Sequence, residues 1–222
     1  MVNILDYCVS RNNFDGRTLS KYVVELDNGR HFQNILMIRS VTTGLWMRRL
    51  LKDDPRVIHI VYRSDPQPVV DGVVEQDQVP ELLEQMGRQF DLIVMDPFHE
   101  YNVSIRDLYL NYSLLTDDGI IVSHDCYPPT RPQACALYTP GKWCGETYIA
   151  LVQFARDHPH LYYAVTTTDH GIGIISKQYM SSMSNSLCQD HQDELLRLHR
   201  LGSSNTYSYF RQHSALLINV LN

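Results

Sequence analysis

The stretch Phe90-Asp91-Leu92-Ile93-Val94-Met95-Asp96 is continuously apolar in its middle and ends on an aspartate. A strand that is buried on both faces has this composition, because helices cover both sides of a parallel sheet. We therefore predict a central strand of a parallel sheet over residues 90–96, with Asp96 at its carboxyl end.

Strand-like and helix-like segments alternate on both sides of this central strand. The predicted strands are 35–39, 56–62, 69–75, 120–123, 161–167 and 171–176, and the predicted helices are 43–52, 79–89, 101–115 and 146–158. A turn is predicted at 117–119. The alternation predicts βαβ units and a doubly wound, mostly parallel α/β sheet. The link at 168–170 is too short for a parallel crossover, so the last two strands are predicted to form an antiparallel hairpin.

The length of 222 residues suits one domain. We predict an α/β domain over residues 1–180, which includes an N-terminal helical segment. Residues 181–222 are predicted to form a Ser-rich linker, at 181–186, and a C-terminal helical extension, at 190–201 and 207–221, packed on the same domain. This helical arm could serve a homodimer.

Composition excludes several classes of function. The net charge of −6 disfavours a nucleic-acid partner, because phosphate backbones require clustered Lys and Arg. No apolar run approaches the about 20 residues that span a bilayer, and the start of the chain lacks the pattern of a signal peptide. Five cysteines, an odd number, argue against a complete disulfide framework. These features predict a cytoplasmic protein.

Acidic and histidine side chains follow two predicted neighbouring strands. Asp96 and His99 follow strand 90–96, and His124 and Asp125 follow strand 120–123. Ligands of open α/β sheets bind outside the carboxyl ends of the strands, so these four side chains are expected in one crevice. Asp96 and Asp125 could bind a divalent cation, or a histidine could act as a general base. Each residue alone could instead be structural, but the two motifs together favour a function.

As strand-end polar groups, Asp96 and Asp125 are expected to contribute little to the core, so that Asp96→Asn and Asp125→Asn reduce activity but leave the fold intact. The next segment, 126–143, carries four prolines and no periodicity, and is predicted to be a long loop. Eight residues separate Cys126 from Cys135 and Cys135 from Cys144. Structural zinc sites prefer pairs separated by two to four residues, which disfavours zinc on spacing. Tyr127, Tyr138 and Trp143 could form a lid or a sugar platform, or pack the loop onto the body.

Several segments resemble one family. Residues 90–101, FDLIVMDPFHEY, resemble the "FDLIFIDGxHxY" segment of small class I S-adenosylmethionine-dependent methyltransferases, which are often found in sugar and polysaccharide biosynthesis. Residues 106–108 match "RDL", 118–128 resemble "GGxIVxHDCxP", 143–148 are similar to "WxGDVW", and 168–173 resemble "TDYGxG". The resemblance is good over 90–176 and loose at the ends, and it depends on the common order and spacing of these motifs.

The first predicted strand departs from the family pattern. There the family has an acidic residue and a glycine-rich turn, "ExGxxxG". Here Met37 occupies the acidic position, Arg39 and Val41 occupy glycine positions, and only Gly44 is kept. A Cβ at a glycine position can block the approach of the cofactor. If the methyl donor binds, Arg39 and Val41 must therefore be oriented away from it.

The second predicted strand departs as well. In the family it ends in an acid that holds the ribose hydroxyls, whereas here the first acid is Asp65, about three residues late. Each lost hydrogen bond to the ribose would cost on the order of 1 kcal/mol. Asp65 or Tyr62 is expected to replace the missing acid.

The resemblance implies a methyltransferase that uses S-adenosylmethionine and acts on a hydroxyl of a sugar or another small acceptor. The positions that it implies for the donor are Ile38, Ser40, Gly44, Asp65 and Asp96. The acceptor would lie over Asp96, His99, His124 and Asp125, with His99 as the first choice of base and Asp125 as the second. In-line placement is the main requirement of the transfer.

Two other classes of function stay open at this point. A non-catalytic relative would keep the fold, lose the cofactor and act as a partner protein. A metal-dependent enzyme of another class would keep the acceptor side and discard the donor side. The fold alone does not decide between them.

Overall fold

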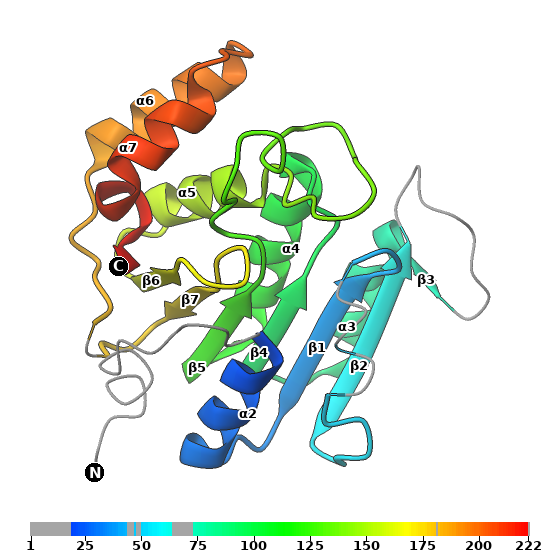
Figure 1. Cartoon of the computed structure of the whole chain (residues 1–222). Coiled ribbons are helices and arrows are strands. Elements are labelled where there is room, and N and C mark those ends of the chain that lie inside the picture. The colour runs from blue at the N-terminus through cyan, green and yellow to red at the C-terminus, as the bar shows by residue number, and fades with distance from the viewer. Residues whose placement is uncertain (1–18, 44–46, 48–49, 64–72, 181, 222) are drawn as a thin grey trace.

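The computed structural model describes residues 19–43, 47, 50–63, 73–180 and 182–221. Its strands are β1 (Ile35–Ser40), β2 (Val57–Arg63), β3 (Val74–Glu75), β4 (Phe90–Asp96), β5 (Leu115–Ser123), β6 (Tyr162–Thr166), β7 (Gly173–Ser176) and β8 (Val220–Leu221). Within the described residues they form one eight-stranded sheet in the order β3-β2-β1-β4-β5-β7-β6-β8 (Figure 1).

The sheet is mostly parallel. Strands β3, β2, β1, β4 and β5 pair in parallel. Strand β7 is antiparallel to both β5 and β6, which closes the predicted hairpin. The predicted fold class, a doubly wound α/β sheet with a final antiparallel hairpin, is therefore confirmed.

Helices cover both faces of the sheet. They are α2 (Leu19–Arg30), α3 (Val79–Met86), α4 (Tyr101–Ser113), α5 (Thr147–Asp157), α6 (Gln189–Arg200) and α7 (Thr206–Ile218). Successive side chains of a strand point to opposite faces. Leu92 and Val94 of β4 accordingly pack in one apolar cluster with α2. Ile93 and Met95 pack in the other cluster with α3, α4 and α5. The two-sided burial explains why β4 is continuously apolar.

The C-terminal helices pack on the same core. Leu195 of α6 and Phe210 of α7 are buried in the cluster that also contains the apolar residues of α5. The chain then turns at Asn219, which has a φ of 52°, and β8 pairs in parallel with β6. The predicted helix at 207–221 thus ends earlier than expected, and its last residues extend the sheet. In the described part of the chain, no helix has the length and apolar character needed to span a bilayer.

Two local predictions are wrong. In the predicted helix 43–52, residues 50–52 form a turn, and Leu51 has a φ of 48°, a left-handed conformation that cannot continue a helix. Residues 44–46 and 48–49 of that prediction lie outside the described residues. The predicted turn at 117–119 lies inside β5, because buried Leu115 already pairs with Phe90 before residues 116–119 bulge out of register.

The order of the strands creates a crevice at one edge of the sheet. The chain runs outward from β1 through β2 to β3, and then crosses back to place β4 on the other side of β1. Arg39 near the end of β1 lies opposite Asp96 at the end of β4. Ligands of doubly wound sheets bind at such a switch point, outside the carboxyl ends of the strands.

The hydroxyl of Tyr62 in β2 gives a test of this packing. It donates to Asp107 Oδ2 at 2.6 Å and accepts from the Phe98 N–H at 3.1 Å, in a fully buried position. Tyr62→Phe leaves both partners buried without it, so we expect a loss of about 1–3 kcal/mol in the free energy of unfolding, measured with urea. Tyr109→Phe, whose side chain is 39% exposed, is the control. Equal losses in the two variants would contradict the prediction.

Candidate active site at the carboxyl edge of the sheet

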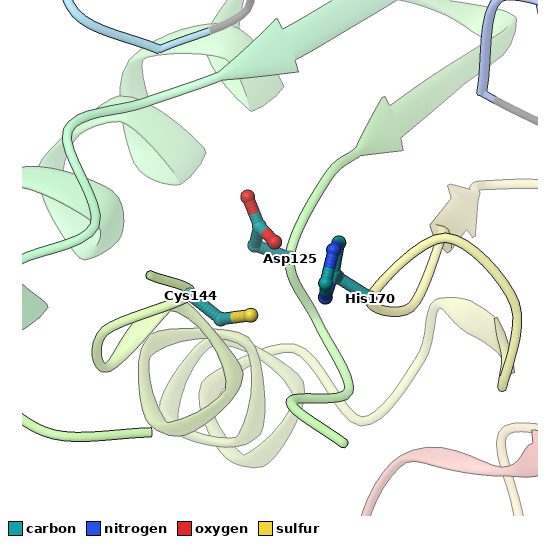
Figure 2. A group of neighbouring side chains, drawn as sticks. All are labelled: Asp125, Cys144 and His170. Atoms are coloured by element: carbon teal, nitrogen blue, oxygen red, sulfur yellow. The ribbon is translucent and has the colours of Figure 1, made fainter. Parts of the chain in front are cut away.

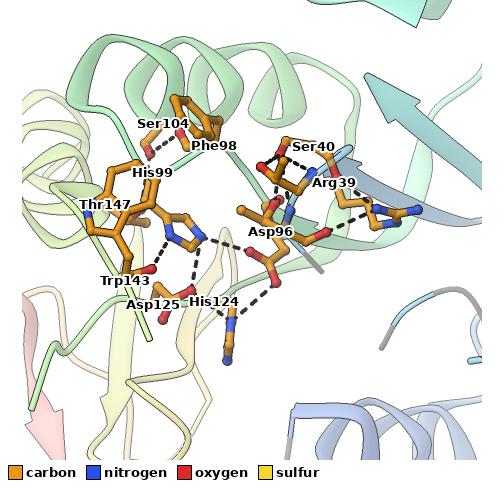
Figure 3. A network of polar contacts seen from close by, with 12 residues as sticks. Arg39, Ser40, Asp96, Phe98, His99, Ser104, His124, Asp125, Trp143 and Thr147 are labelled. Atoms are coloured by element: carbon orange, nitrogen blue, oxygen red, sulfur yellow. Dashed lines mark hydrogen bonds and ion pairs between the residues drawn. The ribbon is translucent and has the colours of Figure 1, made fainter. Parts of the chain in front are cut away.

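Four predicted side chains meet at the carboxyl edge of β4 and β5 (Figure 3). Asp96 is the last residue of β4, and His99 lies in the turn that leads into α4. His124 and Asp125 follow β5 directly. The four residues are only 2–8% exposed. This burial runs against the expectation that Asp96 and Asp125 contribute little to the core, because buried charged groups are costly unless they are paired. That their Asn variants keep the fold stays a prediction.

Each histidine lies between the two carboxylates. His99 Nε2 is 3.0 Å from Asp96 Oδ1 and 3.0 Å from Asp125 Oδ2. His124 Nδ1 is 3.3 Å from Asp96 Oδ2 and 3.1 Å from Asp125 Oδ2. Two carboxylates this close repel unless a cation, a proton or a hydrogen-bond donor lies between them. In this chain two imidazoles take that place.

The pairing changes the pKa values of the network. Burial by itself lowers the pKa of His99, but the charges of Asp125 and Asp96 outweigh burial and raise that pKa above 6.5. The same balance raises the pKa of His124 further. Burial by itself raises the pKa of Asp96, but His124 and His99 reverse the effect and hold that pKa below 3.8. These shifts favour the protonated form of both imidazoles and the ionised form of Asp96, and so favour ion pairing within the network.

The network is anchored to three other parts of the chain. The Nδ1 atom of His99 lies 2.7 Å from the Trp143 carbonyl oxygen, in the long loop. The Nε2 atom of His124 is 3.6 Å from Asp169 Oδ2, in the link between β6 and β7. The same Asp169 oxygen accepts from the N–H of Leu19, the first residue of α2, at 2.6 Å. Sequence reasoning missed Asp169, which only the hairpin geometry brings to the site.

A cavity of about 290 Å³ opens over the network. Its lining includes Thr43, Asp96, Asp125, Tyr138, Trp143 and His170. The two aromatic residues of the loop differ in burial. Trp143 is buried and donates its indole N–H to the Cys135 carbonyl at 2.8 Å, so it packs the loop onto the body. Tyr138 is 45% exposed and stands 5.1 Å, between ring centroids, from Trp143 at the cavity.

The predicted donor positions are described in part. Gly44 and Asp65 lie outside the described residues. Ile38 is buried in the core. Ser40 is also buried, and its Oγ accepts from the N–H groups of Thr42 and Thr43 at 3.3 Å, which organises the turn after β1.

The two residues at the glycine positions do not line the cavity. The Nη1 atom of Arg39 donates to the carbonyls of Ser40 at 2.8 Å and Thr43 at 3.1 Å, so its side chain holds the same turn. Val41 is buried as well, and its N–H donates to the Tyr62 carbonyl at 2.8 Å. Their Cβ atoms therefore do not block the space above Asp96.

The expectation that Tyr62 could replace the ribose acid is wrong, because its hydroxyl is buried between Asp107 and the Phe98 N–H. A second cavity, of about 510 Å³, lies instead beyond the ends of β2 and β3. Its lining includes Arg63, Glu75, Asp77, Glu100 and Arg106. The sequence carries a signal for this cavity. Glu75 ends the predicted strand 69–75, and Asp77 lies two residues after it.

Comparisons with known proteins agree with the fold. No protein-family model matches the chain, and no curated protein matches its sequence. The chain is similar to the structure of a putative caffeoyl-CoA O-methyltransferase from Staphylococcus aureus, with 11% identity, a TM-score of 0.50, and 73% of this chain and 84% of that chain covered. The structure of an SAH-bound methyltransferase from Podospora anserina has 14% identity and a TM-score of 0.46, with 80% of this chain and 87% of that chain covered. The structure of an O-methyltransferase from Bacillus cereus in complex with SAH has 11% identity and a TM-score of 0.46, with 78% of this chain and 87% of that chain covered. The similarity to the Staphylococcus aureus structure concerns the fold alone.

The ion pairs predict the protonation of the two histidines. At pH 6.5, the ordinary pKa of histidine, His99 and His124 should each be more than half protonated in the metal-free protein, because the pKa of each ring is raised. Ring ¹⁵N chemical shifts measured in the presence of EDTA check this. Asp96→Asn removes one carboxylate, so it should lower the pKa of both histidines. Neutral rings in the wild-type protein, or unchanged pKa values in a folded Asp96→Asn variant, would refute the ion-paired network.

Proposed function

We propose that the chain is an S-adenosylmethionine-dependent methyltransferase that methylates a hydroxyl of a small acceptor, a sugar or a similar compound. The observation that carries the proposal is the buried network of Asp96, His99, His124 and Asp125 below a cavity at the switch point of the sheet. The fold shared with the putative O-methyltransferase from Staphylococcus aureus supports it.

The donor would lie across the ends of β1 and β4. S-adenosylmethionine supplies a methyl group on a positively charged sulfur. Asp96 would face the sulfonium side, and the turn after Ser40 would border the amino-acid part, with Gly44 and Asp65 as further contacts. The side chains of Arg39 and Val41 leave this space clear. The cavity beyond β2 and β3 offers room for the adenosine, and its acids can accept hydrogen bonds from ribose hydroxyls.

The acceptor would occupy the cavity over His99 and Asp125, beside Tyr138. Its hydroxyl oxygen forms the new bond to the methyl carbon, the carbon–sulfur bond breaks, and the electron pair stays on sulfur. The hydroxyl proton passes to a base of this chain. His99 is the first candidate, but its raised pKa means that it must first lose a proton. Asp125 is the second, because a carboxylate can accept the proton directly.

A divalent cation is a further part of the proposal. Asp96, His124 and Asp125 present donor atoms that all lie within 4.8 Å of one another. Carboxylate oxygens suit hard cations, and a cation there would polarise the acceptor hydroxyl. It would have to replace the imidazole of His124 between the carboxylates, or use that ring as a ligand.

The alternative hypothesis is a non-catalytic partner protein, and the altered turn after β1 supports it. Calorimetry with S-adenosylmethionine distinguishes this hypothesis from the proposed methyltransferase. We expect micromolar binding by the wild-type chain, and weaker binding by Asp96→Asn because the variant removes a negative charge near the sulfonium. Thermal melting of both proteins controls for folding. A folded wild-type chain that binds neither S-adenosylmethionine nor its demethylated product would favour the non-catalytic partner protein.

The raised pKa of His99 sets the pH dependence of the reaction. If neutral His99 is the base, kcat/KM should rise with pH and reach its plateau above the ordinary histidine pKa of 6.5. His99→Ala should abolish that rise and lower kcat more than it changes KM for the acceptor. A rate that is independent of pH above 6.5 in the wild type would instead assign the proton to Asp125. If His99→Ala and Asp125→Asn lose activity only in proportion to lost folded protein, the network is structural.

A further inference from the structure

A second group of donor atoms has Asp125 in common with the network. It consists of Asp125, Cys144 and His170, whose side chains point toward one another in Figure 2. One ligand atom from each residue lies within 4.8 Å of the others. The three residues come from the segment after β5, the end of the long loop and the link between β6 and β7. The spacing of Cys126, Cys135 and Cys144 disfavours a zinc site made of these three cysteines. The present group contains only one of them, Cys144, together with Asp125 and His170.

The backbone around two of these donors is closely fitted. A Cβ on Gly145, which follows Cys144, would lie 2.1 Å from the His99 carbonyl oxygen. A Cβ on Gly171, which follows His170, would lie 2.1 Å from the Tyr127 backbone nitrogen. Both glycines also have a positive φ, at 55° and 93°. Other residues are therefore excluded at these two positions, and the donors are held in place by their neighbours.

Asp125 of this group is already paired with His99 and His124, so any need for a further partner lies with the other two donors. Cys144 is fully buried. The Nδ1 atom of His170 is buried, and within the part of the chain that the structure describes it has no hydrogen-bond partner. A buried polar atom without a partner is rare in proteins and requires an explanation, such as an ion.

We propose that Asp125, Cys144 and His170 bind a divalent cation of the zinc class. Sulfur, imidazole nitrogen and carboxylate oxygen are the three ligand types that proteins use for zinc. In a tetrahedral site with the usual bond lengths, neighbouring ligand atoms are about 3.5 Å apart, so small side-chain rotations bring this group into position. Asp125 and His170 also line the cavity of about 290 Å³, which leaves a fourth coordination position open toward it.

The sulfur ligand separates this site from the group of Asp96, His124 and Asp125. Thiolates select zinc and other softer metals, whereas carboxylates with few nitrogen ligands suit magnesium. The two groups have Asp125 in common, so its carboxylate would lie between them. The inference does not depend on the proposed methyl transfer, because it uses only the positions of the three donor atoms.

Zinc binding by the full chain tests the site. We expect one Zn²⁺ per chain in competition with a chromophoric chelator, and a thiolate-to-metal charge-transfer band when Co²⁺ replaces Zn²⁺. Removing a partner that only orients a ligand already costs about 10–100-fold in metal affinity, so Cys144→Ser and His170→Gln should each cost about 100-fold or more. Cys135→Ser is the matched control, since this half-buried thiol of the same loop contacts Leu137 and Thr139 instead. It should bind zinc like the wild type.

Several outcomes would overturn the proposal: no zinc binding by the folded wild-type chain, equal zinc affinity in Cys144→Ser, or a cobalt complex without the thiolate band. Thermal melting shows whether each variant is folded, and the cobalt spectrum of the wild type tests the sulfur ligand without any substitution. Asp96→Asn should keep the thiolate band of the cobalt complex, because Asp96 is not a member of this group. A chain that binds zinc in this way but never binds S-adenosylmethionine would contradict the proposed function alone.

Discussion

The burial of the Asp96 and Asp125 carboxylates in one small space is the constraint on which this edge of the molecule depends. Each unpaired carboxylate would be costly at that depth, so two imidazole rings must stay between them. The long loop holds His99 in place, because the carbonyl oxygen of Trp143 lies beside the Nδ1 atom of His99. Holding His124 involves Asp169, which also fixes the start of α2. The polar network therefore ties the loop, the hairpin and the first helix to the sheet.

The parts of the fold that follow local patterns could be predicted from the sequence. β4 was predicted with its observed bounds, because burial on both faces leaves a continuous apolar run. The convergence of Asp96 and Asp125 follows from the parallel order of β4 and β5. The place of Asp169 and the proximity of Cys144 to His170 could not be predicted, because they depend on how distant loops fold over the strand ends. The left-handed Leu51 carries no sequence signal, since leucine otherwise favours helix.

The donor side shows why a changed motif does not by itself reveal a lost site. Arg39 at a glycine position looks like an obstacle in the sequence, but a strand side chain can point to either face. In the structure its guanidinium satisfies the carbonyls of Ser40 and Thr43, and so it stabilises the turn that glycines would otherwise form. A buried guanidinium with these acceptors fixes the turn more firmly than glycines would, because glycine leaves the backbone free.

Charge links the donor to the base in the proposed reaction. The carboxylates of Asp96, Asp125 and Asp169 face the two imidazole rings of His99 and His124. With both rings protonated, the network would carry one net negative charge. A sulfonium donor brings one positive charge beside Asp96 and balances it. The same positive charge opposes the protonated form of His99, since like charges disfavour the charged form. Arrival of the donor would thus lower the pKa of His99 and favour its neutral, basic form when there is a methyl group to transfer.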